Sequence, residues 1–114
     1  MHELSIALNI VDVAAEEAAA RDGRVTAVHL RLGVFSGVVK EALTAAWTLA
    51  RENTPLAQAE LVVEEIPLVV WCEACAAERT LVWEEGLCCP VCKGATPQVL
   101  RGREMEVFAL EIES

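Results

Sequence analysis

The chain has 114 residues, 54% of them hydrophobic, which allows one modest globular domain plus a small module. Its formal charge of −9 argues against a nucleic-acid-binding surface, because affinity for phosphates comes largely from Lys and Arg. No run of about eighteen apolar residues and no basic stretch leading into an apolar segment is present, so the sequence predicts neither a membrane span nor a signal peptide, and we expect a cytoplasmic protein.

The first predicted element is a helix from Leu4 to Arg21. Leu4, Leu8, Val11, Ala14 or Ala15, and Ala18 recur at three- and four-residue steps, as on one face of a helix, and Gly23 is a natural stop. These spacings predict an amphipathic helix that buries this stripe.

Val25 to Gly33 alternates between apolar and polar residues, which predicts a half-buried strand. Within it, His29 falls opposite the apolar side, so we interpret it as a solvated strand residue and not as a metal ligand. Ser36 and Gly37 are predicted to open a second helix, which Asn53-Thr54-Pro55 ends. Trp47 has the spacing of an ordinary core residue in that helix.

Glu60 to Val70 is rich in β-branched residues, which predicts a second strand, and Pro67 indicates a break or an edge position. Two C-x-x-C pairs follow, Cys72 with Cys75 and Cys89 with Cys92. Each pair presents its thiolates from a tight turn, and the two turns can converge on one tetrahedral ion.

The segment between the pairs is too short to form a core of its own. Metal binding would contribute roughly 10 to 16 kcal/mol of apparent folding energy, against about 3 kcal/mol for a short disulfide loop. The two pairs therefore predict a closed structural zinc site.

Other interpretations of the cysteines are weaker. Two disulfides are disfavoured because nothing indicates secretion, and a thiol–disulfide redox centre would need only one reactive C-x-x-C near a βαβ pattern. Cys88 is a fifth cysteine, which spoils any even pairing. We interpret Cys88 as a bystander because Cys89 keeps the spacing and precedes a proline, although Cys88 with Cys92 is an alternative geometry.

The last predicted strand runs from Glu104 to Glu113, with Phe108, Leu110 and Ile112 on one side and Glu111 on the other. The order of elements predicts an α+β fold, in which two helices pack on a small three-stranded mixed sheet with an inserted four-cysteine zinc module. We expect the module to lie between two strands that pair side by side, like an enlarged hairpin. The predicted domains are an α/β domain of residues 1–70 and 98–114, which also carries the amino terminus, and an inserted zinc-binding domain of residues 71–97.

The first three residues offer a second metal site. The terminal amine of Met1, the deprotonated backbone nitrogen of His2 and its imidazole Nδ1 can close two fused chelate rings on one ion. Glu3 can complete a tetragonal set through its amide nitrogen or its carboxylate, and such planar sets suit Ni(II) or Cu(II) rather than zinc. A histidine at position 2 alone means little, because chain ends are usually frayed and dispensable.

The sequence as a whole resembles the HypA/HybF family of hydrogenase-maturation nickel chaperones. The resemblance rests on the opening Met1 to Ser5, on the segment Leu30 to Ser36, on the two C-x-x-C pairs and on the closing strand with its alternating Glu, and it covers essentially the whole chain. It implies that His2, Glu3 and backbone nitrogens of the terminus bind nickel, and that Cys72, Cys75, Cys89 and Cys92 bind zinc.

The resemblance also implies a carrier and not an enzyme. Such a carrier would work with a HypB-type nickel GTPase and deliver nickel to the large subunit of [NiFe] hydrogenase, and some members of the family also serve urease. The sequence does not decide between a monomer and a homodimer. Two alternatives come from other classes: a zinc-ribbon module that bridges partner proteins without a second metal, and a thiol oxidoreductase. No Ser/His/Asp set, phosphate-cradling glycine loop or pocketed carboxylate pair is evident in the sequence.

Overall fold

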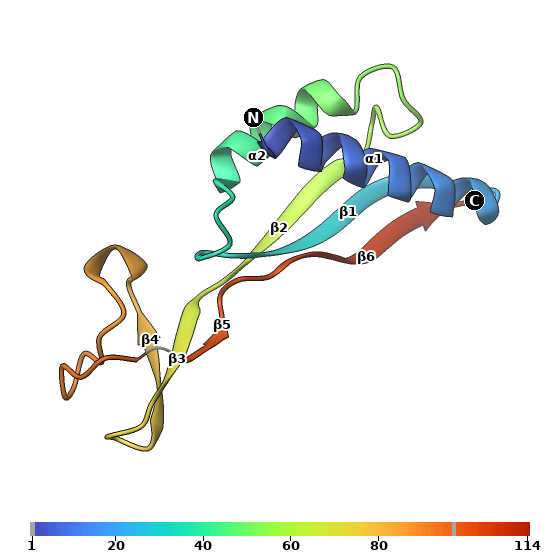
Figure 1. Ribbon diagram of the computed structural model, residues 1–114. Coiled ribbons are helices and arrows are strands. Elements are labelled where there is room, and N and C mark those ends of the chain that lie inside the picture. The colour runs from blue at the N-terminus through green and yellow to red at the C-terminus, as the bar shows by residue number, and fades with distance from the viewer. Residues whose placement is uncertain (1, 97) are drawn as a thin grey trace. The chain divides into compact units, whose positions relative to one another are not determined.

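A computed structural model describes residues 2–96 and 98–114, without the side chains of His2 and Trp83 (Figure 1). The elements follow in the order α1 (His2–Ala20), β1 (Arg24–Gly33), α2 (Lys40–Ala50), β2 (Glu60–Ile66), β3 (Leu68–Cys72), β4 (Ala77–Leu81), the 3-10 helix η1 (Trp83–Glu85), β5 (Gln98–Arg101) and β6 (Met105–Glu113). The chain divides into two compact units, the first of residues 1–31, 38–64 and 106–114, and the second of residues 32–37 and 65–105.

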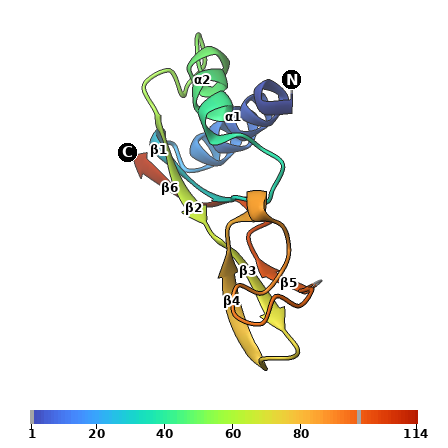
Figure 2. The same ribbon diagram turned by 90° about the vertical axis from the view of Figure 1, so that its left-hand side faces the viewer.

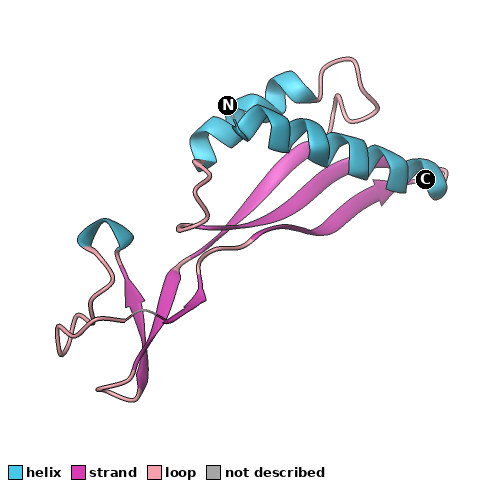
Figure 3. Cartoon of the chain, viewed as in Figure 1, coloured by secondary structure: helices cyan, strands magenta, loops and turns pink. Residues whose placement is uncertain are grey.

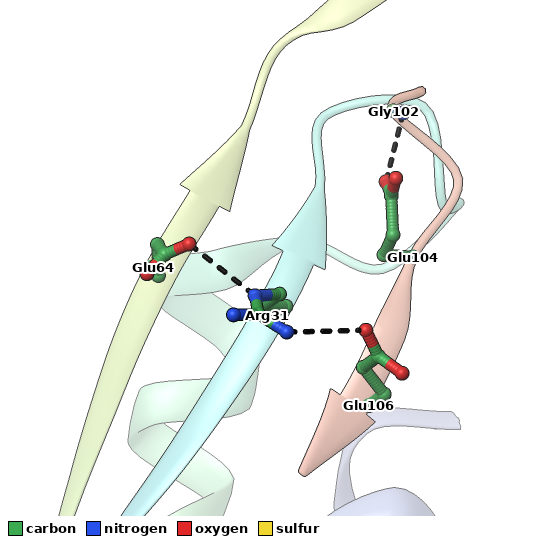
Figure 4. A network of polar contacts seen from close by, with 5 residues as sticks. All are labelled: Arg31, Glu64, Gly102, Glu104 and Glu106. Carbon is green, nitrogen blue, oxygen red and sulfur yellow. Dashed lines mark hydrogen bonds and ion pairs between the residues drawn. The ribbon is translucent and has the colours of Figure 1, made fainter. Parts of the chain in front are cut away.

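The first unit contains the two α-helices, which cover one face of a three-stranded sheet in the order β2-β1-β6 (Figures 1 and 2). The arrows of β1 and β2 point the same way and that of β6 points the opposite way, so this sheet is mixed, as predicted (Figure 4). Val28, Leu30, Leu43 and Trp47 are buried in its core. The indole nitrogen of Trp47 donates to the carbonyl of Ala59 at 3.0 Å, which satisfies the polar atom of this buried ring.

The buried stripe of α1 agrees with the prediction only in its second half. Val11, Ala14 and Ala18 are buried as predicted, but Leu4 and Leu8 are 41% and 47% exposed, and Ala7 and Ile10 are buried instead. Small side chains let neighbouring elements approach closely, and this advantage is invisible when residues are ranked by apolar size alone.

The second helix begins later than predicted, at Lys40 and not at Ser36. Gly37 has a φ of +84°, and Val39 at the N-cap is extended, so neither residue is part of the helix. The predicted end is confirmed, because Asn53 has a φ of +58° just beyond Ala50.

The predicted strand from Glu60 to Val70 is two strands in the structure, β2 and β3, which are separated at Pro67 and belong to different sheets (Figure 3). The expected side-by-side pairing of the second and last strands of the mixed sheet is wrong, because β1 lies between β2 and β6. The hairpin-like pairing forms in the second sheet, where β3 pairs antiparallel with both β4 and β5.

The alternation predicted for β6 holds in its second half, where Leu110 and Ile112 are less exposed than Glu111 and Glu113. Phe108 is exposed, and its ring centroid lies 5.9 Å from that of His29, whose Nε2 lies 2.6 Å from the Glu111 carboxylate. The guanidinium carbon of Arg31 lies 4.0 Å from the Phe108 centroid, and this cation–π contact accounts for an aromatic ring among charged groups. Arg31 also pairs with Glu64 and Glu106 (Figure 4).

The second unit has a small core. Leu68, Val70 and Leu81 are buried in it, with Phe35, Leu87 and Val99 packed around them. The unit spans residues 65–105 with 32–37, so it is larger than the 71–97 segment predicted to hold zinc.

A close backbone approach between Gly33 and Gly102 belongs to the same unit. The Gly33 N–H donates to the carbonyl of Glu104, and the Phe35 N–H donates to that of Gly102, both at 2.7 Å. A Cβ atom on Gly33 would overlap the carbonyl of Gly102, so only glycine fits there. No helix among the described residues is long and apolar enough to cross a membrane.

Candidate metal centre

Two turns of the second unit present the four cysteines of the C-x-x-C pairs. Cys72 is the last residue of β3, and Cys75 follows in the turn before β4, where Ala76 has a φ of +51°. Cys89 and Cys92 come from a second turn closed by two backbone bonds, from the Lys93 N–H to the Cys89 carbonyl and from the Cys89 N–H to the Gly94 carbonyl, both at 2.8 Å. Each pair therefore lies on a tight turn, as the spacing predicts.

The four sulfur atoms converge. All four Sγ atoms lie within 4.8 Å of one another, with 3.5 Å between Cys72 and Cys92 and 3.9 Å between Cys75 and Cys89. A tetrahedral zinc ion with Zn–S bonds of about 2.3 Å requires sulfur atoms about 3.8 Å apart. All five cysteines are free thiols, and the four sulfurs fit a tetrahedral thiolate-bound cation.

Backbone amides stabilise the charged form of Cys89. The N–H groups of Cys92 and Val91 point at its sulfur, with nitrogen–sulfur distances of 3.5 and 3.4 Å. The Cys92 amide, with help from Val91 and the Arg79 guanidinium, lowers the pKa of Cys89 to about 6 although desolvation opposes the shift.

Cys92 has the opposite shift. The Gly94 amide lowers the pKa of Cys92, but sharing a proton with Cys72, desolvation and the sulfurs of Cys89 and Cys75 together raise it to about 11. Four crowded thiolates do not all ionise without a compensating cation, and a bound divalent ion removes that penalty.

Sequence reasoning missed Arg79 as a residue of this centre. The sulfurs of Cys75 and Cys89, as hydrogen-bond acceptors, raise the pKa of Arg79. The signal was available in the alternation of Ala77–Leu81, where Arg79 shares a face with the buried Leu81. Cys88 lies outside the four-sulfur group, and its thiol is exposed.

The predicted nickel ligands are only partly within the described structure. Met1 lies outside the described residues, and His2 is the first residue of α1, with no side chain described. The Glu3 carboxylate accepts a hydrogen bond from the backbone N–H of Val39, the N-cap residue of α2, at 3.3 Å. Backbone hydrogen bonds from Glu3's own N–H and from Val39 lower the pKa of Glu3.

A two-helix α/β unit and a second unit with a four-cysteine centre define this chain as a small metal-binding protein. Residues 1–112 match the family model described as hydrogenase/urease nickel incorporation, metallochaperone, HypA. The chain belongs to the HypA family, as its sequence motifs predict.

Relatives and solved structures agree with this assignment. The chain is 51% identical to the hydrogenase maturation factor HypA of Chloroflexus aurantiacus, over 97% of this chain and 98% of the relative. It is 48% identical to that of Roseiflexus sp. strain RS-1, over 99% and 93%.

Two solution structures share the fold. The nickel metallochaperone HypA from Helicobacter pylori has a TM-score of 0.63 at 19% identity, with 96% of each chain covered. A second HypA protein has a TM-score of 0.71 at 21% identity, with 99% of this chain and 97% of that chain covered. The predicted α+β fold with an inserted four-cysteine module is confirmed.

Proposed function

We propose that this chain is a nickel carrier which binds Ni(II) at its amino terminus and delivers it during maturation of [NiFe] hydrogenase. The match of residues 1–112 to a family of nickel-incorporation metallochaperones is the observation that carries the proposal, because it includes the Met1-His2-Glu3 terminus. The role is that of a carrier and not of an enzyme.

The terminal donors have favourable chemistry for a loosely held cargo. Helix α1 begins at His2, and the first N–H groups of a helix have no intrahelical acceptor, so an amide there can lose its proton without breaking a helical hydrogen bond. The imidazole of His2, the Met1 amine and Glu3 complete the proposed set. An exposed end with few supporting contacts binds weakly and exchanges its ion readily, as delivery requires.

Glu3 has a competing contact. Its carboxylate already accepts the Val39 N–H, so binding nickel through the carboxylate would share or displace that hydrogen bond. Binding through the Glu3 amide nitrogen leaves the Val39 hydrogen bond intact but removes the proton with which the Glu3 N–H bonds this carboxylate, so either donor atom would give up one contact.

We further propose that Cys72, Cys75, Cys89 and Cys92 hold a structural zinc ion. The sulfur distances of 3.5 and 3.9 Å support zinc, as does the soft, all-thiolate donor set. A small core of three buried side chains gives this unit a need for metal-derived stability.

The same family assignment leads us to propose the partners and the division of the chain. The partners are a HypB-type nickel GTPase and the large subunit of [NiFe] hydrogenase, and the compartment is the cytoplasm. Nickel would belong to the α/β domain of residues 1–70 and 98–114, and zinc to residues 71–97.

Nickel binding by three forms of the full chain tests the proposal. We would titrate Ni(II) into the native chain, a His2→Ala variant and a form extended before Met1, and measure the zinc content of each. We expect the native chain to bind one nickel ion, the other two forms to lose most of that affinity, and all three to keep zinc. Equal nickel affinity in all three would refute terminal binding and favour a zinc-ribbon module without a second metal.

A further inference from the structure

The inner face of the second sheet changes character along its length. In the antiparallel register of β3 and β4, Leu68 lies opposite Leu81, Val70 opposite Arg79 and Cys72 opposite Ala77. Alternate residues of a strand share one face, so these three pairs line the same face. Arg79 therefore lies between the apolar cluster of Leu68 and Leu81 and the metal-binding end at Cys72.

Burying a guanidinium at this position costs free energy unless an acceptor group takes the hydrogen bonds of its N–H donors. Within the described residues the buried Nε of Arg79 has no hydrogen-bond partner, and one terminal nitrogen has only a long 3.5 Å contact with the Glu78 carbonyl. The neighbouring carboxylate of Glu78 is engaged elsewhere, at 2.7 Å from Arg101 on β5. Arg79 is thus not held by an ion pair with Glu78.

Sulfur atoms are the acceptors at the Cys72 end of this face. The thiols of Cys75 and Cys89, one from each C-x-x-C pair, raise the pKa of Arg79, and Arg79 helps to lower the pKa of Cys89, as a guanidinium close to thiolates does. We propose that Arg79 is a positioning residue of the metal centre, whose fork of N–H donors bridges the two cysteine turns by hydrogen bonds to Cys75 and Cys89. This inference rests on the metal site proposed above.

The charge balance explains what such a residue does. Four thiolates around a divalent cation leave two uncompensated negative charges, and one guanidinium removes half of that excess. Hydrogen bonds from outside the ligand shell also orient metal ligands, and their loss typically weakens metal affinity by about 10- to 100-fold. Arg79 would therefore strengthen zinc binding and draw electron density from two of the four sulfurs.

The test compares three variants of the full chain, Arg79→Gln, Arg79→Lys and the matched control Arg101→Gln. Arg101 is an arginine of the same sheet whose guanidinium pairs with the Glu78 carboxylate at 2.7 Å. Zinc affinity is measured by competition with a chromophoric chelator. The thiolate-to-metal charge-transfer band of the Co(II)-substituted protein reports the electron density at sulfur.

We expect Arg79→Gln to weaken zinc binding by about 10- to 100-fold and to shift the Co(II) band to longer wavelength, because the sulfurs lose a hydrogen-bond donor. Arg79→Lys keeps the cation and the aliphatic stem without the planar fork, so it should restore part of the affinity even if the glutamine variant folds poorly. Arg101→Gln should stay within about threefold of the native affinity, because exposed ion pairs contribute little.

The outcomes separate this inference from the metal site itself. A native chain that takes up no zinc would overturn both. A native chain that binds zinc, with an Arg79→Gln variant of equal affinity and unchanged Co(II) spectrum, would overturn the role of Arg79 alone. If Arg79→Lys binds zinc no more tightly than Arg79→Gln, the positive charge at position 79 does not strengthen zinc binding, and the charge-balance argument is overturned.

Discussion

Removing zinc should unfold the second unit and leave the first unit folded. The three buried side chains of its core contribute about 1.5 to 3 kcal/mol each. A structural zinc ion in a small module contributes roughly 10 to 16 kcal/mol of apparent folding energy. Most of the stability of this unit therefore depends on the metal, whereas α1, α2 and the mixed sheet share a larger core of their own.

Hydrogen exchange followed by mass spectrometry measures this difference segment by segment. With zinc bound, the amides of Val69 to Trp71 should be protected, because β3 pairs on both edges. After treatment with a chelator under reducing conditions, we expect their exchange to accelerate by at least about a thousandfold, while Leu43 to Trp47 in α2 changes little. Protection of β3 that survives complete loss of zinc would refute the reasoning.

Four further outcomes are expected. Gly33→Ala should lower the free energy of unfolding by about 1 to 3 kcal/mol in a denaturant titration, since its methyl group overlaps the Gly102 carbonyl; native stability would contradict the overlap. Cys88→Ser should leave zinc stoichiometry unchanged by metal analysis, and lost zinc would make Cys88 a ligand. Nickel affinity measured by calorimetry should fall as the pH drops through neutrality, because protons compete with nickel for the lone pairs of the imidazole and the amine, whose reference pKa values are about 6.5 and 7.7 to 8.0. An affinity that does not change with pH would contradict terminal binding. The pKa of Glu3 is lowered from 4.5, so the stabilisation from its ionised carboxylate is complete above pH 4.5 and is lost as the pH falls through the lowered pKa. The stabilities of the Glu3→Gln variant and the native chain should therefore converge in acid, and a difference that stays constant with pH would argue against this contact.

Local signals in the sequence predicted the parts of the fold that depend on neighbouring residues. Pro67 has no N–H to donate, and the predicted strand breaks there. The two C-x-x-C spacings predicted two tight turns, and the structure has one at each pair. These features follow from a few consecutive residues, so no long-range information was needed.

Strand order and side-chain neighbours depend on contacts between distant residues. Nothing near β2 or β6 in the sequence states that β1 separates them. The exposed ring of Phe108 contacts Arg31 and His29, which lie far away along the chain. In α1 the predicted period holds, but Ala7 is buried whereas the larger Leu4 and Leu8 are exposed.

Within the metal centre, too, local features could be predicted from the sequence and contacts between distant residues could not. The convergence of the four cysteines could be predicted because each sulfur is placed by its own turn. Arg79 was missed because its place depends on recognising Ala77–Leu81 as a strand, whose register sets Arg79 opposite Val70 and two positions from the Cys72–Ala77 pair. A single arginine in an otherwise acidic segment reads as an exposed charge until that register is known. Under our proposal, the sulfurs accept the hydrogen bonds of Arg79 once the register places it on this face, so a positive charge at the thiolates would depend on the sheet as well as on the two turns.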